Sequence, residues 1–219
     1  MAILPFVAAL LAVGLSTSPV AAMSTTTSAF AGYSVKAAGT SFDVTLKVPS
    51  FKCTVKRSII SAGIQTYDAP NSGDNGSMIV FYCSKTLVPS YYAELEVDGN
   101  IAEPQMSIGP GNLVTMTVTC GTDGTDISLL DPTINQDAYT GSDSPSTCTD
   151  SQFGDIGYGK DQSAIPDFGL MRFSQANENG DALGSLSPKV HNYNEGTGKV
   201  ITTGALTHGG LNFNTTDGS

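Results

Sequence analysis

Residues 77–97 read SMIVFYCSKTLVPSYYAELEV and predict two strands joined by a short loop. Residues 78–82 are almost wholly apolar. Residues 91–97 alternate instead, so Tyr92, Glu94 and Glu96 share one side of their strand and Tyr91 points to the other. The hairpin therefore predicts a tyrosine and two carboxylates on one surface. It leaves open whether that surface is an exposed polar face or the wall of a binding cleft.

Similar segments recur along the chain, separated by turns rich in Gly, Asn, Asp and Pro. Residues 113–120 (LVTMTVTC) alternate cleanly, and no window shows the 3.6-residue apolar period of a helix. The other predicted strands are residues 41–48, 58–64, 127–130, 168–175, 199–203 and 211–214. We therefore predict an all-β fold, a sandwich or jelly roll of two antiparallel sheets.

The N-terminal segment is typical of a secretory signal peptide. The first 35 residues carry no charged side chain, and the apolar run at residues 3–15 is followed by the small-residue pattern Val20, Ala21, Ala22. The run is shorter than the ~20 residues that a membrane span needs, although an anchor is the rival interpretation. We predict a signal peptide at 1–22 and one secreted, extracellular domain at 23–219, with no membrane association after cleavage. Residues 24–31, rich in Ser and Thr, are predicted to fray.

The charge balance limits the partners. The chain has 20 acidic residues against 10 Lys and Arg, a net charge of −10. Binding to nucleic acid needs clustered positive charge, so we expect no nucleic-acid partner. The same acidity argues against anionic membranes. We expect a monomer without a cofactor.

Four cysteines in an exported chain indicate disulfides, and three pairings are possible. We favour Cys53 with Cys83 and Cys120 with Cys148, because each pair closes a loop of roughly 30 residues. A zinc site needs closely spaced ligands such as Cys-x-x-Cys, and none is present, so we expect no metal.

The two histidines, His191 and His208, lie among turn-like residues. A Ser-His-Asp triad needs a histidine held by an acid and facing a serine, and no Gly-x-Ser-x-Gly elbow occurs. We therefore expect both histidines at the surface.

Several short motifs occur in an order that resembles the secreted glutamic peptidases, the eqolisin family, over most of the chain. The matching pieces are Val48-Pro49-Ser50, Ala62-Gly63-Ile64, Pro89-Ser90-Tyr91-Tyr92-Ala93 with Glu96, residues 108–118, Asp167-Phe168-Gly169 and residues 196–213. The resemblance implies a concanavalin-like β-sandwich of two curved sheets. It also implies a catalytic pair, a glutamate that activates water as general base and a glutamine amide that stabilises the oxyanion.

That pair is missing at the matching positions. The glutamine is expected on the strand before Cys83, but no Gln or Glu occurs between Asp74 and Glu94. The glutamate position falls on Ile156, and no Glu occurs between Glu103 and Glu178. We therefore predict a pseudoenzyme that keeps the framework and loses the chemistry.

Three hypotheses follow. In the first, the former cleft binds polypeptide or glycan through Tyr92, Glu94, Glu96 and Gln65. In the second, Asp155 and Gln65 form a relocated carboxylate–amide pair in an acid endopeptidase. Neighbouring residues on a strand face opposite sides, so Asp155 points away from the cleft unless a bulge intervenes. In the third, the protein is structural or surface-associated and its cleft is vestigial.

Overall fold

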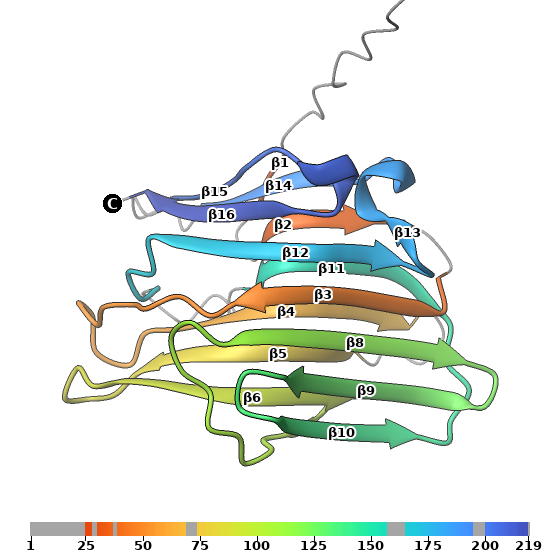
Figure 1. Ribbon diagram of the computed structural model, residues 1–219, viewed down its shortest axis with the longest axis horizontal. Helices are drawn as coiled ribbons and strands as arrows, with labels where there is room; N and C mark the ends of the chain where they lie inside the picture. Colours follow the sequence, from red (N-terminus) through yellow and green to blue (C-terminus); the bar gives the residue numbers. More distant parts are fainter. Residues whose placement is uncertain are drawn as a thin grey trace, which may run out of the picture.

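The computed structural model describes residues 25–27, 30–36, 39–68, 74–156, 165–194 and 200–218. Within these ranges the strands form one path of hydrogen-bonded neighbours, which folds over so that two layers lie face to face (Figure 1). The predicted all-β sandwich is confirmed. No helix in these ranges is long and apolar enough to span a membrane. The predicted signal peptide at 1–22 lies outside the described residues.

The front layer in Figure 1 shows why alternating sequences form its strands. In β8 (Leu113–Gly121), Val114, Met116 and Val118 are fully buried, while Leu113 on the other face is exposed. The order of this layer is β10 (Gln136–Ser142), β9 (Gly124–Asp131), β8, β3 (Ser41–Lys47), β12 (Leu170–Glu178) and β16 (Phe213–Gly218), with β13 (Asp181–Ala182) paired to β12.

The back layer contains the quoted hairpin. Its order is β2 (Phe30–Val35), β11 (Cys148–Ile156), β4 (Ile59–Asp68), β5 (Asp74–Cys83), β6 (Pro89–Val97) and β7 (Asn100–Ala102). The strands β15 (Val200–Thr203) and β14 (Lys189–Asn194) connect the two layers, and β1 (Thr25–Thr27) runs parallel to β14. Two 3-10 turns occur at Leu183–Leu186 and His208–Gly210.

The two layers are held together by aromatic packing, by a hydrogen bond and by a disulfide. Phe42 from β3 meets Phe153 from β11, with ring centroids 6.4 Å apart. The Ser77 hydroxyl donates to the Ser128 carbonyl across the interface, at 2.9 Å. The Cys120–Cys148 bond ties β8 to β11, and Cys53–Cys83 ties the loop before β4 to the end of β5. The predicted pairing is therefore confirmed, and each bond contributes a few kcal/mol.

Some of the local predictions were wrong. The segment predicted to fray contains β1 and the start of β2, because β14 and β11 supply hydrogen-bonding partners for this backbone and Phe30 is buried. The strands β10, β11 and β14 were not predicted. Their sequences, QDAYTGS, CTDSQFGDI and KVHNYN, mix polar and turn-forming residues. Pairing determines their conformation, with β9 alone for the edge strand β10 and with neighbours on both sides for β11 and β14.

Candidate functional site

The outer face of the back layer, which points away from the front layer, brings polar residues from distant parts of the sequence together. The strand register places Gln152 on β11 opposite Gln65 on β4, Gln65 opposite Gly76 on β5, and Gly76 opposite Glu96 on β6. Residues that are directly opposite in neighbouring strands share a face of the sheet. This polar row therefore crosses the layer at right angles to the strands.

An acidic cluster occupies the β4–β6 side of this face and consists of Gln65, Tyr67, Asp74, Glu94 and Glu96. The Tyr67 hydroxyl donates to Gln65 Oε1 at 3.3 Å, and Gln65 Nε2 donates to Asp74 Oδ2 at 3.3 Å. The side chain of Gln65 thus uses both its acceptor and its donor inside the cluster. The amide is held in a fixed orientation next to two carboxylates.

The cluster shifts the titration of its members. Burial is the largest cause that raises the pKa of Glu96 to about 7, Asp74 and Glu94 raise it further, and a hydrogen bond from Gln65 opposes the rise. Burial also raises the pKa of Asp74. The pKa of Tyr67 is raised to about 12 by burial and then by Asp74, Glu96 and Asp150. At acidic pH, Glu96 is therefore protonated and donates hydrogen bonds as well as accepting them.

The hairpin residues Tyr92 and Glu94 are not part of an exposed polar face. Glu94 is only 4 % exposed, and burial followed by the charge of Glu94 raises the pKa of Tyr92 to about 12. Tyr91 points to the core as predicted: it packs edge-on against Phe51 and Phe81, with ring centroids 5.0 and 5.6 Å away. The predicted division of the two tyrosines between the two faces is confirmed.

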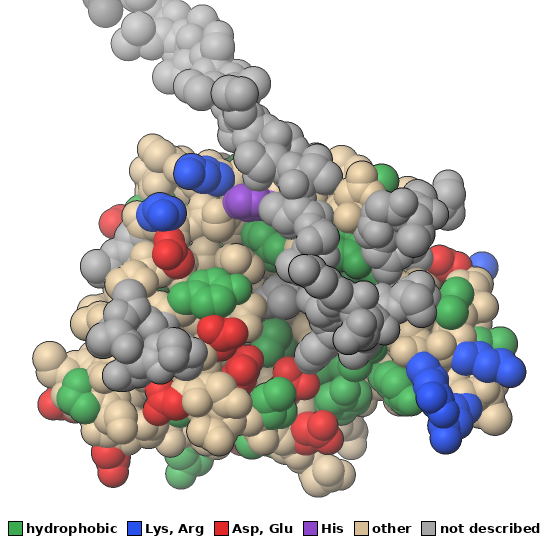
Figure 2. Space-filling model, turned by 180° about the vertical axis from the view of Figure 1, so that it is seen from behind, with side chains coloured by type: hydrophobic (Ala, Val, Ile, Leu, Met, Phe, Trp, Pro, Cys, Tyr) green, Lys and Arg blue, Asp and Glu red, His purple; other side chains and the backbone are tan. Residues whose placement is uncertain are grey.

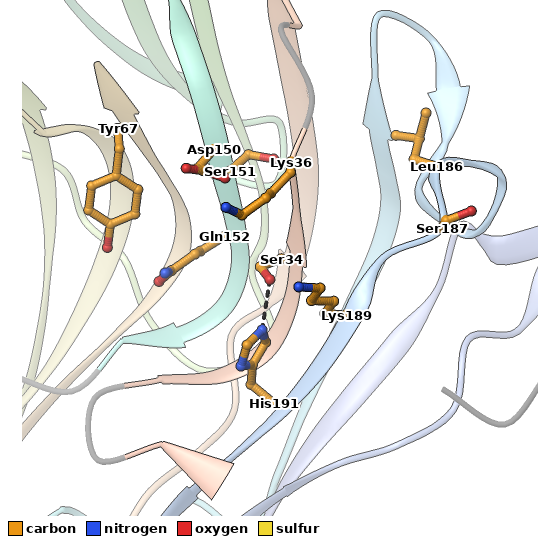
Figure 3. Close-up of a pocket in the computed structure, with 10 residues that line it drawn as sticks. All are labelled: Ser34, Lys36, Tyr67, Asp150, Ser151, Gln152, Leu186, Ser187, Lys189 and His191. Atoms are coloured by element: carbon orange, nitrogen blue, oxygen red, sulfur yellow. Dashed lines mark hydrogen bonds between the residues drawn. The ribbon is translucent and has the colours of Figure 1, made fainter. Parts of the chain in front are cut away.

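A pocket of about 460 Å³ adjoins the cluster on the β2–β14 side (Figure 3). It is lined by Ser34, Lys36, Tyr67, Asp150, Ser151, Gln152, Leu186, Ser187, Lys189 and His191. Ser34 Oγ lies 2.7 Å from His191 Nε2. Burial, followed by the charge of Lys189, lowers the pKa of His191, so the imidazole is neutral at pH 7.

The sequence did not point to this pocket. His191 was expected at the surface, but it lies half-buried on β14, and Ser34 lies on β2 in the next strand. The only available signal was the charge of Lys189 and Lys36 in an acidic chain. Their proximity depends on the β2–β14 pairing, which sequence periodicity does not reveal.

Asp155 does not join the outer face. It lies opposite Ala62 of β4, two residues from Phe153 on the core side of β11, and it is 1 % exposed. Its carboxyl oxygens have at most one weak hydrogen bond among the described residues, from the Thr215 hydroxyl. Burial is the largest cause that raises the pKa of Asp155 to about 8, the Thr215 hydrogen bond opposes the rise, and the charge of Asp217 adds to it. The structure therefore places Asp155 and Gln65 on opposite faces of the same sheet.

The positions that the sequence resemblance assigns to the eqolisin catalytic pair lie on strands of the same layer. Ile156 ends β11 opposite Ser61, and β5 carries no Gln or Glu anywhere along its length. Within the described residues, no group of His, Cys, Asp and Glu is arranged to hold a metal ion.

Comparison with known proteins links this geometry to one fold. No family model and no curated protein sequence matches the chain. Solved structures do: scytalido-glutamic peptidase with a transition-state analogue inhibitor superposes with a TM-score of 0.66 and 14 % identity, over 86 % of this chain and 98 % of that one. The structure of SCP-B, an eqolisin in complex with the tripeptide Ala-Ile-His, superposes with a TM-score of 0.63 and 15 % identity, again over 86 % of this chain and 98 % of that one. The chain has the β-sandwich fold of the eqolisin peptidases.

Proposed function

We propose that this peptidase-related protein is secreted and binds an extended polypeptide across the outer face, without cleaving it by the eqolisin mechanism. The observation that carries the proposal is the acidic cluster, in which Tyr67, Gln65 and Asp74 are hydrogen-bonded to one another beside Glu96. Carboxylates, an amide and a phenol supply the donors and acceptors that an extended peptide backbone requires.

The loss of the catalytic pair supports a binding role. A general base must carry a titratable group, and Ile156 at the matching position has none. Without the amide donor on β5, an oxyanion loses stabilisation that is typically worth about two to three orders of magnitude in rate. The chain keeps the eqolisin fold, and the outer face carries hydrogen-bonding groups that suit recognition.

A peptide suits this face better than a glycan does. The solved structures with the same fold hold a tripeptide or a peptide-based transition-state analogue, which is the reason to consider peptides first. In addition, carboxylates on one side and lysines on the other give the face charges of both signs. A neutral glycan makes no use of such charges, so it is the less favoured ligand.

The proposal predicts that a pool of peptides from an unfolded, alkylated protein contains members that bind to the purified chain. We expect these peptides to co-elute with the protein in gel filtration and to raise its melting temperature. Glu96→Ala should lower the retained fraction severalfold, because the variant removes a central contact of the cluster. Asp123→Ala, at an exposed turn, should leave retention unchanged.

Retention of glycans but not of peptides would assign the face to glycan binding. Retention of neither, by a protein shown to be folded, would leave a structural role with a vestigial cleft and would contradict the proposal.

A second candidate function rests on one observation: Gln65 and Glu96 are in contact and form a carboxylate–amide pair. This pair is better placed for catalysis than Asp155 with Gln65, which lie on opposite faces. However, a carboxyl with a pKa of about 7 is mostly protonated at acidic pH, so it is a poor base there. Any cleavage through Glu96 should rise with pH between 5 and 8 and vanish in Glu96→Gln. Cleavage that peaks near pH 3 would contradict this assignment.

A further inference from the structure

The pocket beside the acidic cluster has a chemistry of its own. The chain has only 10 Lys and Arg, yet Lys36 and Lys189 both line this one pocket. Among the described residues, neither lysine has a hydrogen-bond or ion-pair partner. In Figure 3, the two ammonium groups approach the pocket from the residue that follows β2 and from β14, on either side of Ser34. Two unpaired cations at one pocket favour an anionic ligand.

The neutral groups of the pocket complete an anion site. Ser34 and His191 are hydrogen-bonded, and the tautomer decides the direction of the bond. When His191 Nε2–H donates to Ser34 Oγ, the serine hydroxyl hydrogen is free to donate to an anion. Gln152 adds an amide donor on the next strand. The pocket thus offers two ammonium groups, a hydroxyl and an amide to one bound group.

The single acid in the pocket, Asp150, lies on β11, two strand steps from Lys189 on β14. Asp150 is opposite Tyr67 in the β11–β4 register, and its charge contributes to the raised pKa of Tyr67. It therefore extends the negative charge of the acidic cluster towards β11. Figure 2, which looks at this side of the molecule, shows Lys or Arg side chains beside a histidine in its upper part, with an acidic side chain against them, and most of the acidic side chains further down. The outer face therefore carries two lysines at its β2–β14 end and the acidic cluster at its β4–β6 end.

We propose that the pocket binds a peptide carboxylate, and that a cationic side chain of the same peptide contacts the acidic cluster. The inference rests on the proposed function. It adds the direction in which the peptide lies across the outer face and the charges that the peptide must carry. Neutral glycans carry neither charge, and a polyuronate carries carboxylates along its whole length, which the acidic cluster would repel.

The strand order fixes the distance between the two charges. From β2, where Ser34 lies, there are three strand steps to Asp74 on β5 and four to Glu96 on β6. At about 4.8 Å per step the span is roughly 14 to 19 Å. An extended peptide covers about 3.3 Å per residue, so the cation should precede the carboxylate by about four to six residues.

The test uses fluorescein-labelled peptides of Gly, Ala and Ser that carry one Arg two, five or nine residues before a free C-terminal carboxylate. Fluorescence anisotropy with the purified, disulfide-bonded protein should show tightest binding for the spacing of five. Amidation of the C terminus should lower the affinity of that peptide by about tenfold, as expected for the loss of one partly buried charge contact. An amidated peptide that ends in Glu tests whether the pocket binds a side-chain carboxylate or the C-terminal carboxylate. If the Glu side chain restores the affinity lost on amidation, the pocket binds acidic side chains. If it does not, the pocket binds the C terminus.

Variants test the two ends separately. Lys189→Gln should remove the benefit of the free carboxylate, whereas Lys85→Gln, an identical change of charge at the exposed β5–β6 turn, should not. Glu96→Gln should remove the preference for Arg over Ala in the peptide and keep the preference for the carboxylate. Ser34→Ala should lower the affinity only for peptides with a free carboxylate.

Equal binding of free and amidated peptides, or equal losses in Lys189→Gln and Lys85→Gln, would overturn the inference. If the peptide pool is retained but affinity does not depend on the Arg-to-carboxylate spacing, the inference fails and the proposed function stands. If the pool is not retained, the proposed function itself fails. Tighter binding of an oligouronate than of every peptide would also contradict the inference.

Discussion

Lowering the pH from 8 to 4 should stabilise this protein. Asp155 is fully buried with at most a weak hydrogen bond from the Thr215 hydroxyl, and burial raises its pKa from 3.8 to about 8. The folded chain keeps this carboxyl neutral up to about pH 8, while the unfolded chain ionises it near pH 4. Stability is therefore present below pH 4 and is lost as the pH rises to 8, by an amount on the order of 5 kcal/mol.

Other groups also change how the free energy of unfolding depends on pH. Burial also raises the pKa values of Glu96, Asp74 and Glu178, so these carboxyls act in the same direction. The lowered pKa of His191 acts against them, because below about pH 6.5 the unfolded chain binds that proton more readily. The balance of four carboxyls against one imidazole favours the folded state in acid.

Denaturant unfolding from pH 4 to 8, with both disulfides intact, measures the effect. Asp155→Asn should flatten most of the slope and should be more stable than the parent at pH 8. Asp123→Asn, at an exposed turn, should keep the slope of the parent. A parent protein whose stability rises with pH over this range would show that Asp155 is not the controlling group.

Replacing Gly154 by Ala should strongly destabilise the back layer. Gly154 lies between Gly32 of β2 and Gly63 of β4 in a row across three strands. Its φ is +147°, and an added Cβ would lie 2.2 Å from the Ala31 carbonyl oxygen and 2.8 Å from Gly32 Cα. Both contacts are with backbone, so no side chain can move aside to relieve them.

We expect Gly154→Ala to lower the free energy of unfolding by more than about 3 kcal/mol, because steric overlap adds to the cost of a positive φ. Gly121→Ala is the matched control, since the nearest atom to its added Cβ is the Gly124 carbonyl oxygen at 3.9 Å, an ordinary van der Waals contact. The control should change stability by less than about 0.5 kcal/mol in denaturant unfolding. Equal losses in the two variants would mean that the glycine row does not determine the packing of β2, β11 and β4.

The fold was predictable where the local sequence carries its own pattern. The alternation of residues 113–120 matches β8, and the alternation in residues 91–97 places Tyr91 in the core and Tyr92 on the outer face. The disulfide pairing followed from two loops of similar length. In each case the evidence lies within one strand or one loop closure.

The site was predictable only in part, because it depends on register. Gln65, Glu94 and Glu96 were named from their strands, but the contact of Gln65 with Asp74 requires the β4–β5 pairing. The pocket requires β2, β11 and β14 to be neighbours, and two of these strands have no clear alternation. Residues brought together by such long-range pairing leave no periodic signal in the chain.

The most direct test of a binding rather than a cleaving sandwich is mass spectrometry of an acid-unfolded protein after incubation with the purified chain from pH 3 to 8. We expect the unfolded protein to be bound and recovered intact at every pH, with retention reduced in Glu96→Ala. New fragments that are absent with Glu96→Gln or with Asp155→Asn would contradict a binding role without cleavage, because they would show that a catalytic carboxylate persists in this fold.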